Sequence, residues 1–270
     1  MTAGSIRDYA AIVAAIVCVL IWVRPGAARA GIVNVQSAVA TPAKEGTSGS
    51  ITGSVDWRTG NRTRLWFSLA PVLQHRSGPH VFIGIVSGFY YRDTDDLKVF
   101  EHVRYRYHLG DRWLLEGFGQ HEYNEKRLLL LRALVGFGPR YQAVKRKKLQ
   151  IGVGVAYMAE YEVLKELDDL GPVPAEESPL LNHRISTYLT GSYDVDDRLQ
   201  LAQTLYAQPL MSDVGDIRLL SESVLVIRLS KTLALRTSFV LSYDSLPPAY
   251  GDVKALDSTL LSSLTYSFGP

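Results

Sequence analysis

The chain closes on the stretch Leu264-Thr265-Tyr266-Ser267-Phe268, which only two further residues follow. Apolar and hydroxyl side chains alternate strictly along it. Because successive side chains of a β-strand point to opposite faces, one face is apolar and the other is polar. An apolar face that ends in an aromatic residue is typical of the last strand of a bacterial outer-membrane barrel. The last strand of a soluble sandwich is the alternative, and the rest of the chain has to discriminate between the two.

The pattern that precedes this stretch repeats the same alternation. No run after residue 30 is apolar for 18 residues, so the sequence predicts no membrane-spanning helix. Runs rich in Val, Leu, Tyr, Phe and Thr are instead separated by short polar breaks, which indicates β-strands. We expect twelve strands, at 48–57, 63–75, 79–91, 97–109, 112–124, 127–143, 148–163, 182–194, 197–209, 216–229, 232–244 and 256–268. The predicted fold class is all-β: an antiparallel transmembrane outer-membrane β-barrel of about 12 strands over residues 48–270.

The lengths of the connections favour a membrane barrel over a soluble sandwich. The even-numbered connections are all short, with Gly110-Asp111 and Val195-Asp196 as examples. The long connections are the seventh, ninth and eleventh, at 164–181, 210–215 and 245–255. The first and fifth stay short. Transmembrane barrels have short periplasmic turns and longer outside loops, so both chain ends are expected on the periplasmic side.

The start of the chain resembles a secretory leader. Arg7 precedes an apolar run at 9–23, and Ala28-Arg29-Ala30 follows it, which are the parts of a cleaved signal peptide over residues 1–30. The run is short for a spanning helix, although an uncleaved anchor is the alternative. We therefore expect export to the outer membrane of a Gram-negative cell. Residues 31–47 consist mainly of Ala, Ser, Thr, Val and Gly with one Pro, and they predict an exposed, flexible lead-in to the barrel.

Removal of the leader changes what the composition implies. The full chain has 29 basic and 27 acidic residues, but the leader holds three Arg and one Asp, so 26 of each remain. A neutral mature chain gives no support to nucleic-acid binding. The only cysteine, Cys18, also lies in the leader. The mature chain therefore lacks the thiols that disulfides, thiol catalysis and Cys-ligated zinc need, and we expect no cofactor or metal site.

The predicted fourth strand separates its two faces most clearly. One side of this strand is interpreted as a wholly charged face and carries Lys98, His102, Arg104, Arg106 and His108. The opposite side is apolar and ends in two tyrosines. An Arg that faces lipid costs about 2–4 kcal/mol at the bilayer midplane, so the charged side is expected to face the lumen. Across the barrel, the expected lumen network comprises His102, Arg104, Arg106, Glu116, Gln120, Glu122, Arg132, Arg140, Glu160, Glu162 and Arg184.

Four glycines fall on the same inward face of two neighbouring strands. They are Gly136, Gly138, Gly152 and Gly154. Glycine inside a strand marks a bend or a close approach. We expect this patch to make room for Arg and Tyr side chains opposite, or to let the wall curve sharply.

Several short motifs, taken together, resemble a known family. They are Thr59-Gly60-Asn61, Glu116-Gly-Phe-Gly-Gln120, Arg132-x-x-x-Gly136-x-Gly138, Gly152-x-Gly154 with Met158-x-Glu160, and Tyr266-Ser-Phe268. Over residues 48–268 the chain is similar to the domain-of-unknown-function 481 family, the YdiY-like or salt-induced outer-membrane proteins. The resemblance implies an outer-membrane barrel without an established activity. The tail Gly269-Pro270 departs from the family pattern, because such barrels usually end on the aromatic residue.

The sequence leaves the role of the barrel open between two interpretations. The charges either pair across the lumen and fill it, or line a narrow channel. The expected partners are outer-membrane lipid, lipopolysaccharide and the barrel assembly machinery, and we expect a monomer. In the closing strand, Leu264, Tyr266 and Phe268 should face lipid, and the strand should pair with a segment near Gly53–Trp57.

An enzyme is not expected. A membrane-embedded hydrolase that acts on lipid is the main alternative in function, and a soluble periplasmic β-protein is a further one. The best His–Ser candidate for such a hydrolase is His183 with Ser186, but a spacing of three on a strand puts the two on opposite faces.

Overall fold

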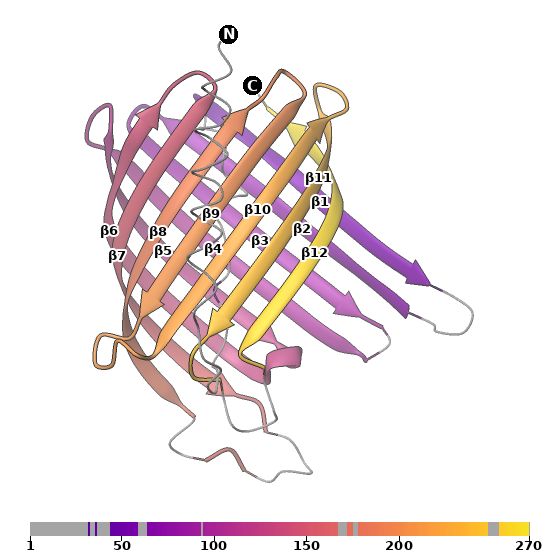
Figure 1. The fold of residues 1–270 in the computed structure, drawn as a ribbon, viewed down its shortest axis with the longest axis vertical. Coiled ribbons are helices and arrows are strands. Elements are labelled where there is room, and N and C mark those ends of the chain that lie inside the picture. Colours follow the sequence, from indigo (N-terminus) through magenta and orange to yellow (C-terminus); the bar gives the residue numbers. More distant parts are fainter. Residues whose placement is uncertain are drawn as a thin grey trace, which may run out of the picture.

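A computed structural model describes residues 32, 36, 44–58, 64–92, 94–166, 172–174, 178–247 and 254–269. The predicted leader at 1–30 and the motif Thr59-Gly60-Asn61 lie outside these residues. Twelve antiparallel strands form a closed barrel in which each strand pairs with its neighbours in the chain and β1 pairs with β12 (Figure 1). The strands are β1 (Gly46–Arg58), β2 (Arg64–Ser77), β3 (His80–Tyr91), β4 (Asp96–His108), β5 (Trp113–Asn124), β6 (Leu129–Lys145), β7 (Leu149–Leu164), β8 (Leu180–Asp194), β9 (Leu199–Pro209), β10 (Ile217–Arg228), β11 (Leu233–Asp244) and β12 (Leu256–Phe268).

The predicted number and order of strands are confirmed, and the bounds shift by only a few residues. The start of β6 differs for a local reason. Glu125–Arg127 form a single 3₁₀ turn, η2, and Leu128 after it has a φ of 53°. This left-handed residue ends the turn, so the strand begins at Leu129 instead of residue 127.

Short and long connections lie at opposite ends of the barrel. The connections β4–β5, β6–β7, β8–β9 and β10–β11 are tight, whereas β7–β8 and β11–β12 are long. β1 starts and β12 finishes at the end with the short turns (Figure 1). Within the described residues, no helix is long and apolar enough to cross a membrane.

The outer surface of the barrel carries large apolar side chains in the open. Val103, Phe137 and Leu260 are 65%, 66% and 71% exposed. Contiguous apolar surface on this scale is not stable against water in a monomer. Aromatic pairs on the same outer face flank it: Phe67 contacts Tyr90 towards the long-loop end, and Trp113 contacts Tyr141 at the short-turn end. Such girdles mark the two bilayer interfaces of membrane barrels.

The interior is less uniformly charged than the fourth strand suggests. Phe100 shares the inward face of β4 with His102 and Arg104, so the expectation of a wholly charged face is wrong at this position. Phe100 completes an apolar cluster on the inner wall of β2, β3 and β4 with Val72, Val81, Ile83 and Ile85. The charges on this face of β4, Lys98, Arg104 and Arg106, pair with carboxylates of β5.

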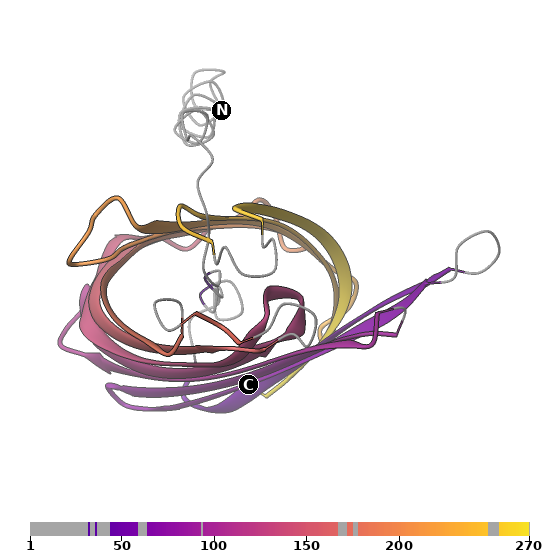
Figure 2. The same ribbon diagram turned by 90° about the horizontal axis from the view of Figure 1, so that it is seen from below.

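The first and last strands close the barrel as predicted, but the residues of β1 that pair with β12 differ from those expected. β12 pairs with β1 from Gly49↔Phe268 to Gly53↔Leu264, whereas Trp57 pairs with Leu65 of β2. The expected closure at Gly53–Trp57 is therefore wrong by about four residues. The cause is visible in Figure 2, where the end of the β1–β2 hairpin runs straight out of the wall while β12 curves with the barrel.

The outward orientation expected for the closing strand is found. Leu264, Tyr266 and Phe268 are 52%, 52% and 42% exposed, and Ser263 is buried on the opposite face.

The lead-in departs from the prediction of an exposed segment. Its two described residues before Lys44, Ile32 and Gln36, are 8% and 3% exposed. Ile32 packs against Tyr188, Tyr206 and Leu220 on the inner wall. These two residues of the lead-in therefore lie inside the barrel, and β1 begins earlier than expected, at Gly46.

Candidate functional site: the charged interior of the barrel

The first group of charges surrounds Glu116 on β5 and is called the Glu116 cluster, made of Arg104, Arg106, Glu116, Arg140 and Tyr188. Arg104 Nη1 lies 3.0 Å from one carboxylate oxygen of Glu116, and Arg106 Nε lies 2.7 Å from the other. The Tyr188 hydroxyl donates to the same carboxylate from β8. Arg140 Nη1 donates to this hydroxyl at 3.3 Å. One carboxylate thus holds together side chains from opposite parts of the wall.

The second group lies towards the long-loop end and is called the ion-pair layer. Its members are Glu122, Arg132, Glu160, Glu162, Arg184, Asp216, Arg218 and Asp244. Glu160, which is fully buried, accepts from Arg132 Nε at 2.8 Å and from Arg218 Nη1 at 2.7 Å. Arg184 Nε also lies 3.4 Å from it. Since β7 and β10 are not neighbours in the barrel, the Glu160–Arg218 pair spans the interior.

Sequence reasoning missed three members of this layer, Asp216, Arg218 and Asp244. Arg218 Nη2 lies 3.0 Å from Glu162, and Arg218 Nε lies 2.9 Å from Asp244. Arg184 Nη2 lies 2.9 Å from Asp216. The only signal for them was the inward parity of Arg218 and Asp244, on strands whose inward faces carry mostly Leu, Val and Ser beside the Glu222–Arg236 pair. Pairing was expected between adjacent strands only. Arg218 and Asp244 are such a pair, opposite each other on β10 and β11, whereas the contact of Arg218 with Glu162 runs across the interior.

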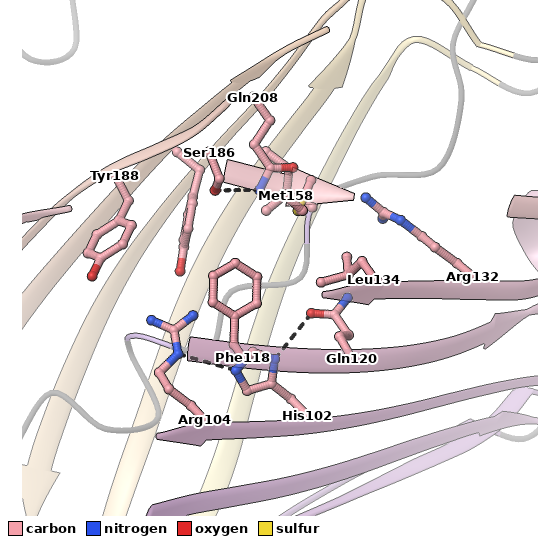
Figure 3. Close-up of a pocket in the computed structure, with 12 residues that line it drawn as sticks. His102, Arg104, Phe118, Gln120, Arg132, Leu134, Met158, Ser186, Tyr188 and Gln208 are labelled. Carbon is pink, nitrogen blue, oxygen red and sulfur yellow. Dashed lines mark hydrogen bonds between the residues drawn. The ribbon is translucent and has the colours of Figure 1, made fainter. Parts of the chain in front are cut away.

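The predicted residues that belong to neither group lie between the two. His102 Nδ1 is 3.4 Å from Gln120 Oε1, and Arg104 Nε is 3.3 Å from His102 Nε2 (Figure 3). Phe118, Leu134 and Met158 lie beside them around a cavity of about 20 Å³. The structure thus brings the eleven predicted residues into one continuous interior, but in two charged groups separated by a mixed level.

A larger cavity of about 260 Å³ opens at the short-turn end and is called the basic cavity. It reaches the exposed turn residues Gly110 and Asp111, and at its inner end it meets Arg106, Arg140 and Gln36. The whole lining is Gln36, Arg76, Val81, Arg106, His108, Gly110, Asp111, Leu114, Arg140, Gln142, Lys145, Gln150, Gly152, Thr190, Gly191, Ser192, Ala202 and Thr204.

The glycine patch makes the close packing of these side chains possible. A Cβ at Gly152 would meet the guanidinium group of Arg140, and one at Gly154 would meet the ring of Tyr188. The prediction that these glycines leave room for Arg and Tyr is confirmed. Gly138 has another role, because a Cβ there would meet the backbone of Val155 and Ala156 on β7. It allows β6 and β7 to approach closely.

One carboxylate outside the spanning strands organises the long-loop end. Glu125 of η2 accepts from Lys165 Nζ at 2.8 Å, from the Tyr123 hydroxyl at 2.7 Å and from Leu97 N at 2.6 Å. These three hydrogen bonds, with that of Lys165 foremost, lower the pKa of Glu125 to about 2. Glu125 therefore ties the starts of β4 and β6 to the end of β7.

The sequence profile of a family described as "Protein of unknown function, DUF481" matches residues 51–268. The chain belongs to this family. The match spans nearly all of the barrel and confirms the resemblance inferred from the motifs. No curated protein matches the sequence.

Several solved structures are similar to this member of the family, and one of them has a TM-score above 0.5. The structure titled "NanC porin structure in rhombohedral crystal form" is 9% identical, with a TM-score of 0.51, over 82% of this chain and 98% of that one. The structure titled "Bacterial polysaccharide outer membrane secretin" is 8% identical, with a TM-score of 0.44, over 84% and 99%. The outer membrane channel DcaP of Acinetobacter baumannii is 11% identical, with a TM-score of 0.36, over 83% and 96%. At such identity the first likeness shows a shared barrel fold.

Proposed function

We propose that the protein is an outer-membrane channel of narrow bore, closed in the conformation described here. The observation that carries this proposal is the basic cavity of about 260 Å³, which enters the barrel at its short-turn end and stops at side chains. The obstruction consists of Gln36, the Glu116 cluster and, beyond them, the ion-pair layer. Side chains change rotamer far more easily than a barrel wall changes its strands, so a path through the interior requires only rearrangement of these groups.

The proposed location rests on the outer surface and the connections. Exposed apolar residues between two aromatic girdles, with short turns at one end, fit a bilayer. We propose export through the leader at residues 1–30, insertion by the barrel assembly machinery, and a monomer in contact with lipid and lipopolysaccharide. A barrel of twelve strands lies between filled eight-stranded barrels and open sixteen-stranded porins.

The second candidate is a filled barrel with a structural role. It is favoured by the ion-pair layer, in which Arg184, Arg218 and Glu160 have no exposed surface. Breaking such a buried pair costs about 3–5 kcal/mol, which makes the layer a strong closure. The two candidates differ in one respect only, namely whether the closure ever opens.

Recordings of single-channel current in planar bilayers test the proposal. We expect refolded protein to give discrete current steps. In a KCl gradient, the reversal potential should indicate greater cation selectivity in Arg104→Ala and greater anion selectivity in Glu116→Ala. Each substitution alters the charge of the wall. Arg112→Gln, at an exposed turn, is the matched control and should leave the reversal potential unchanged. Absence of current, or equal reversal potentials in all variants, would favour the filled barrel.

We also propose that the barrel has no hydrolytic activity. His183 is exposed on the outer face and contacts the Tyr157 hydroxyl at 2.6 Å, whereas Ser186 is buried inside and accepts from Gln208 Nε2 at 2.9 Å. The wall separates this base from this nucleophile. Incubation of refolded protein with phospholipid and lipid A should release no fatty acid, and any release lost in Ser186→Ala would contradict this.

A further inference from the structure

The basic cavity has an uneven balance of charge. Among the described residues, its lining contains four cations, Arg76, Arg106, Arg140 and Lys145, and one carboxylate, Asp111. Arg76 and Arg106 also pair with Glu45 and Glu116 outside the lining, so Arg140 and Lys145 carry the excess of positive charge. His108 adds a group that becomes cationic when it is protonated. Such a concentration of one sign in a recess raises the local concentration of counter-ions.

Two of these cations converge on a neutral oxygen atom. The side-chain oxygen of Gln36 accepts from Arg106 Nη2 at 2.7 Å and from Arg140 Nη1 at 3.1 Å. Gln36 belongs to the lead-in and is 3% exposed at the inner end of the cavity. Guanidinium groups bind carboxylate or phosphate oxygens more strongly than amide oxygens, because both partners are then charged. The Gln36 oxygen therefore occupies a position that suits an oxyanion.

Arg140 is the cation that such an anion would neutralise. Its other hydrogen bonds run to the Tyr188 hydroxyl at 3.3 Å and to Thr190 Oγ1 at 3.1 Å, both neutral. Among the described residues, no carboxylate forms an ion pair with it, in contrast to Arg104 and Arg106. The guanidinium of Arg140 also lies over the space that Gly152 leaves open.

The rest of the lining carries hydroxyl and amide groups. Gln142, Gln150, Thr190, Ser192 and Thr204 line the cavity beside the cations. These groups both donate and accept hydrogen bonds, as a solute with several hydroxyl groups requires. The volume of about 260 Å³ lies near the lower end of small-molecule pockets, roughly 300–1,000 Å³, and suits a solute of the size of one sugar.

We propose that the basic cavity is a binding site for a small hydroxylated oxyanion, a carboxylate or a phosphate ester. One oxygen of the anion binds between Arg106 and Arg140 and displaces the side chain of Gln36. The side chain of Gln36 thus acts as a built-in competitor for the site. This inference rests on the proposed function, because it names the class of solute that would enter the channel. The site can nevertheless be tested by binding measurements that do not depend on conduction.

Calorimetric titration of refolded protein in detergent tests the site. The probes are D-glucuronate, inorganic phosphate and, as a neutral control, D-glucose. We expect glucuronate or phosphate to bind and glucose not to bind, and the anion that binds identifies the charged group. Binding should weaken at least tenfold in Arg140→Gln, and Arg112→Gln, at the same end of the barrel but outside the cavity, should bind as the wild type does.

Two variants of Gln36 leave both arginines in place and test the competition. Gln36→Glu supplies a carboxylate within the chain, so it should weaken anion binding at least tenfold. Gln36→Ala removes the competitor and should bind at least as tightly as the wild type. Equal affinity for glucose and glucuronate, or unchanged anion binding in both Arg140→Gln and Gln36→Glu, would overturn the site. Anion binding without any current would refute the channel and support the binding site. Current without anion binding would support the channel and refute the binding site.

Discussion

At the scale of the residue, Glu160 shows how this barrel fills its interior. Its carboxylate contacts guanidinium groups from β6, β8 and β10, and it is fully buried. A buried carboxylate is costly unless charged hydrogen-bond partners surround it. Three arginines meet this requirement here, and they also exceed the charge of Glu160, which explains why Glu162 and Asp244 join the same layer.

Gly138 gives a prediction about packing at this scale. An added Cβ would lie 2.6 Å from Ala156 Cα, which is backbone of β7 and cannot rotate away. We expect Gly138→Ala to lower the free energy of unfolding by about 1–3 kcal/mol, as overpacking does. Gly84→Ala is the control, because nothing lies within 4 Å of a Cβ there. Urea unfolding in lipid vesicles measures both, and equal midpoints would contradict the close approach.

Glu125 gives a prediction about pH. Its folded pKa of about 2 lies below the value of about 4.3 expected for an unfolded chain. The stability that it contributes is therefore fully present above pH 4.5 and is lost as the pH falls towards 2. Glu125→Gln should be less stable than the wild type at pH 7 and equal to it near pH 2. An equal difference in unfolding midpoint at both pH values would contradict the role of its charge.

At the scale of the element, the seam between β1 and β12 is the weakest join of the barrel. Both strands have 13 residues, but only five pairs connect them, from Gly49↔Phe268 to Gly53↔Leu264. Hydrogen bonds between side chains extend the seam, with Ser54 Oγ 2.7 Å from Ser263 Oγ. Beyond these pairs, towards the end of β1, the β1–β2 hairpin leaves the wall (Figure 2).

Engineered cysteine pairs test the register of the seam. Thr52 is opposite Thr265, and their hydroxyl oxygens are 3.0 Å apart. Thr52→Cys with Thr265→Cys should form a disulfide on mild oxidation, because directly paired residues meet its geometry. Asp56→Cys with Leu261→Cys, which would pair if the ladder continued, should not. Cross-linking of the second pair alone would show that the barrel closes nearer to Trp57.

The strands were largely predictable from the sequence, whereas the contacts between side chains inside the barrel were predictable only in part. Alternation of period two predicts all twelve strands, because each strand has one apolar and one polar environment. It also places Arg132 and Glu160 on the inner face. It does not predict that Arg218 reaches across to Glu160, since contacts over the interior depend on the curvature of the whole wall. The burial of Ile32 and Gln36 was not predicted either, because a stretch rich in Ala, Ser, Thr and Gly is typical of an exposed connection.

At the scale of the molecule, the barrel is a single closed hydrogen-bonded sheet with apolar residues outside. Such a sheet unfolds cooperatively and resists detergent at room temperature, because its backbone groups are paired all around the wall. We expect the refolded protein to migrate differently on a denaturing gel before and after boiling. Identical migration of the two samples would contradict a membrane barrel and would favour a soluble β-protein.

The proposed channel is closed by side chains alone, and the ion-pair layer is the strongest part of this closure. Removing one carboxylate and one guanidinium group together, in Glu160→Ala with Arg218→Ala, keeps the net charge of the layer unchanged and widens the interior between β7 and β10. The most direct measurement is therefore the single-channel conductance of this double variant beside that of the wild type in planar bilayers. We expect small and infrequent current steps for the wild type and larger, longer steps for the variant. Absence of current in both proteins, each shown to be folded by its migration before boiling, would refute a channel closed by side chains.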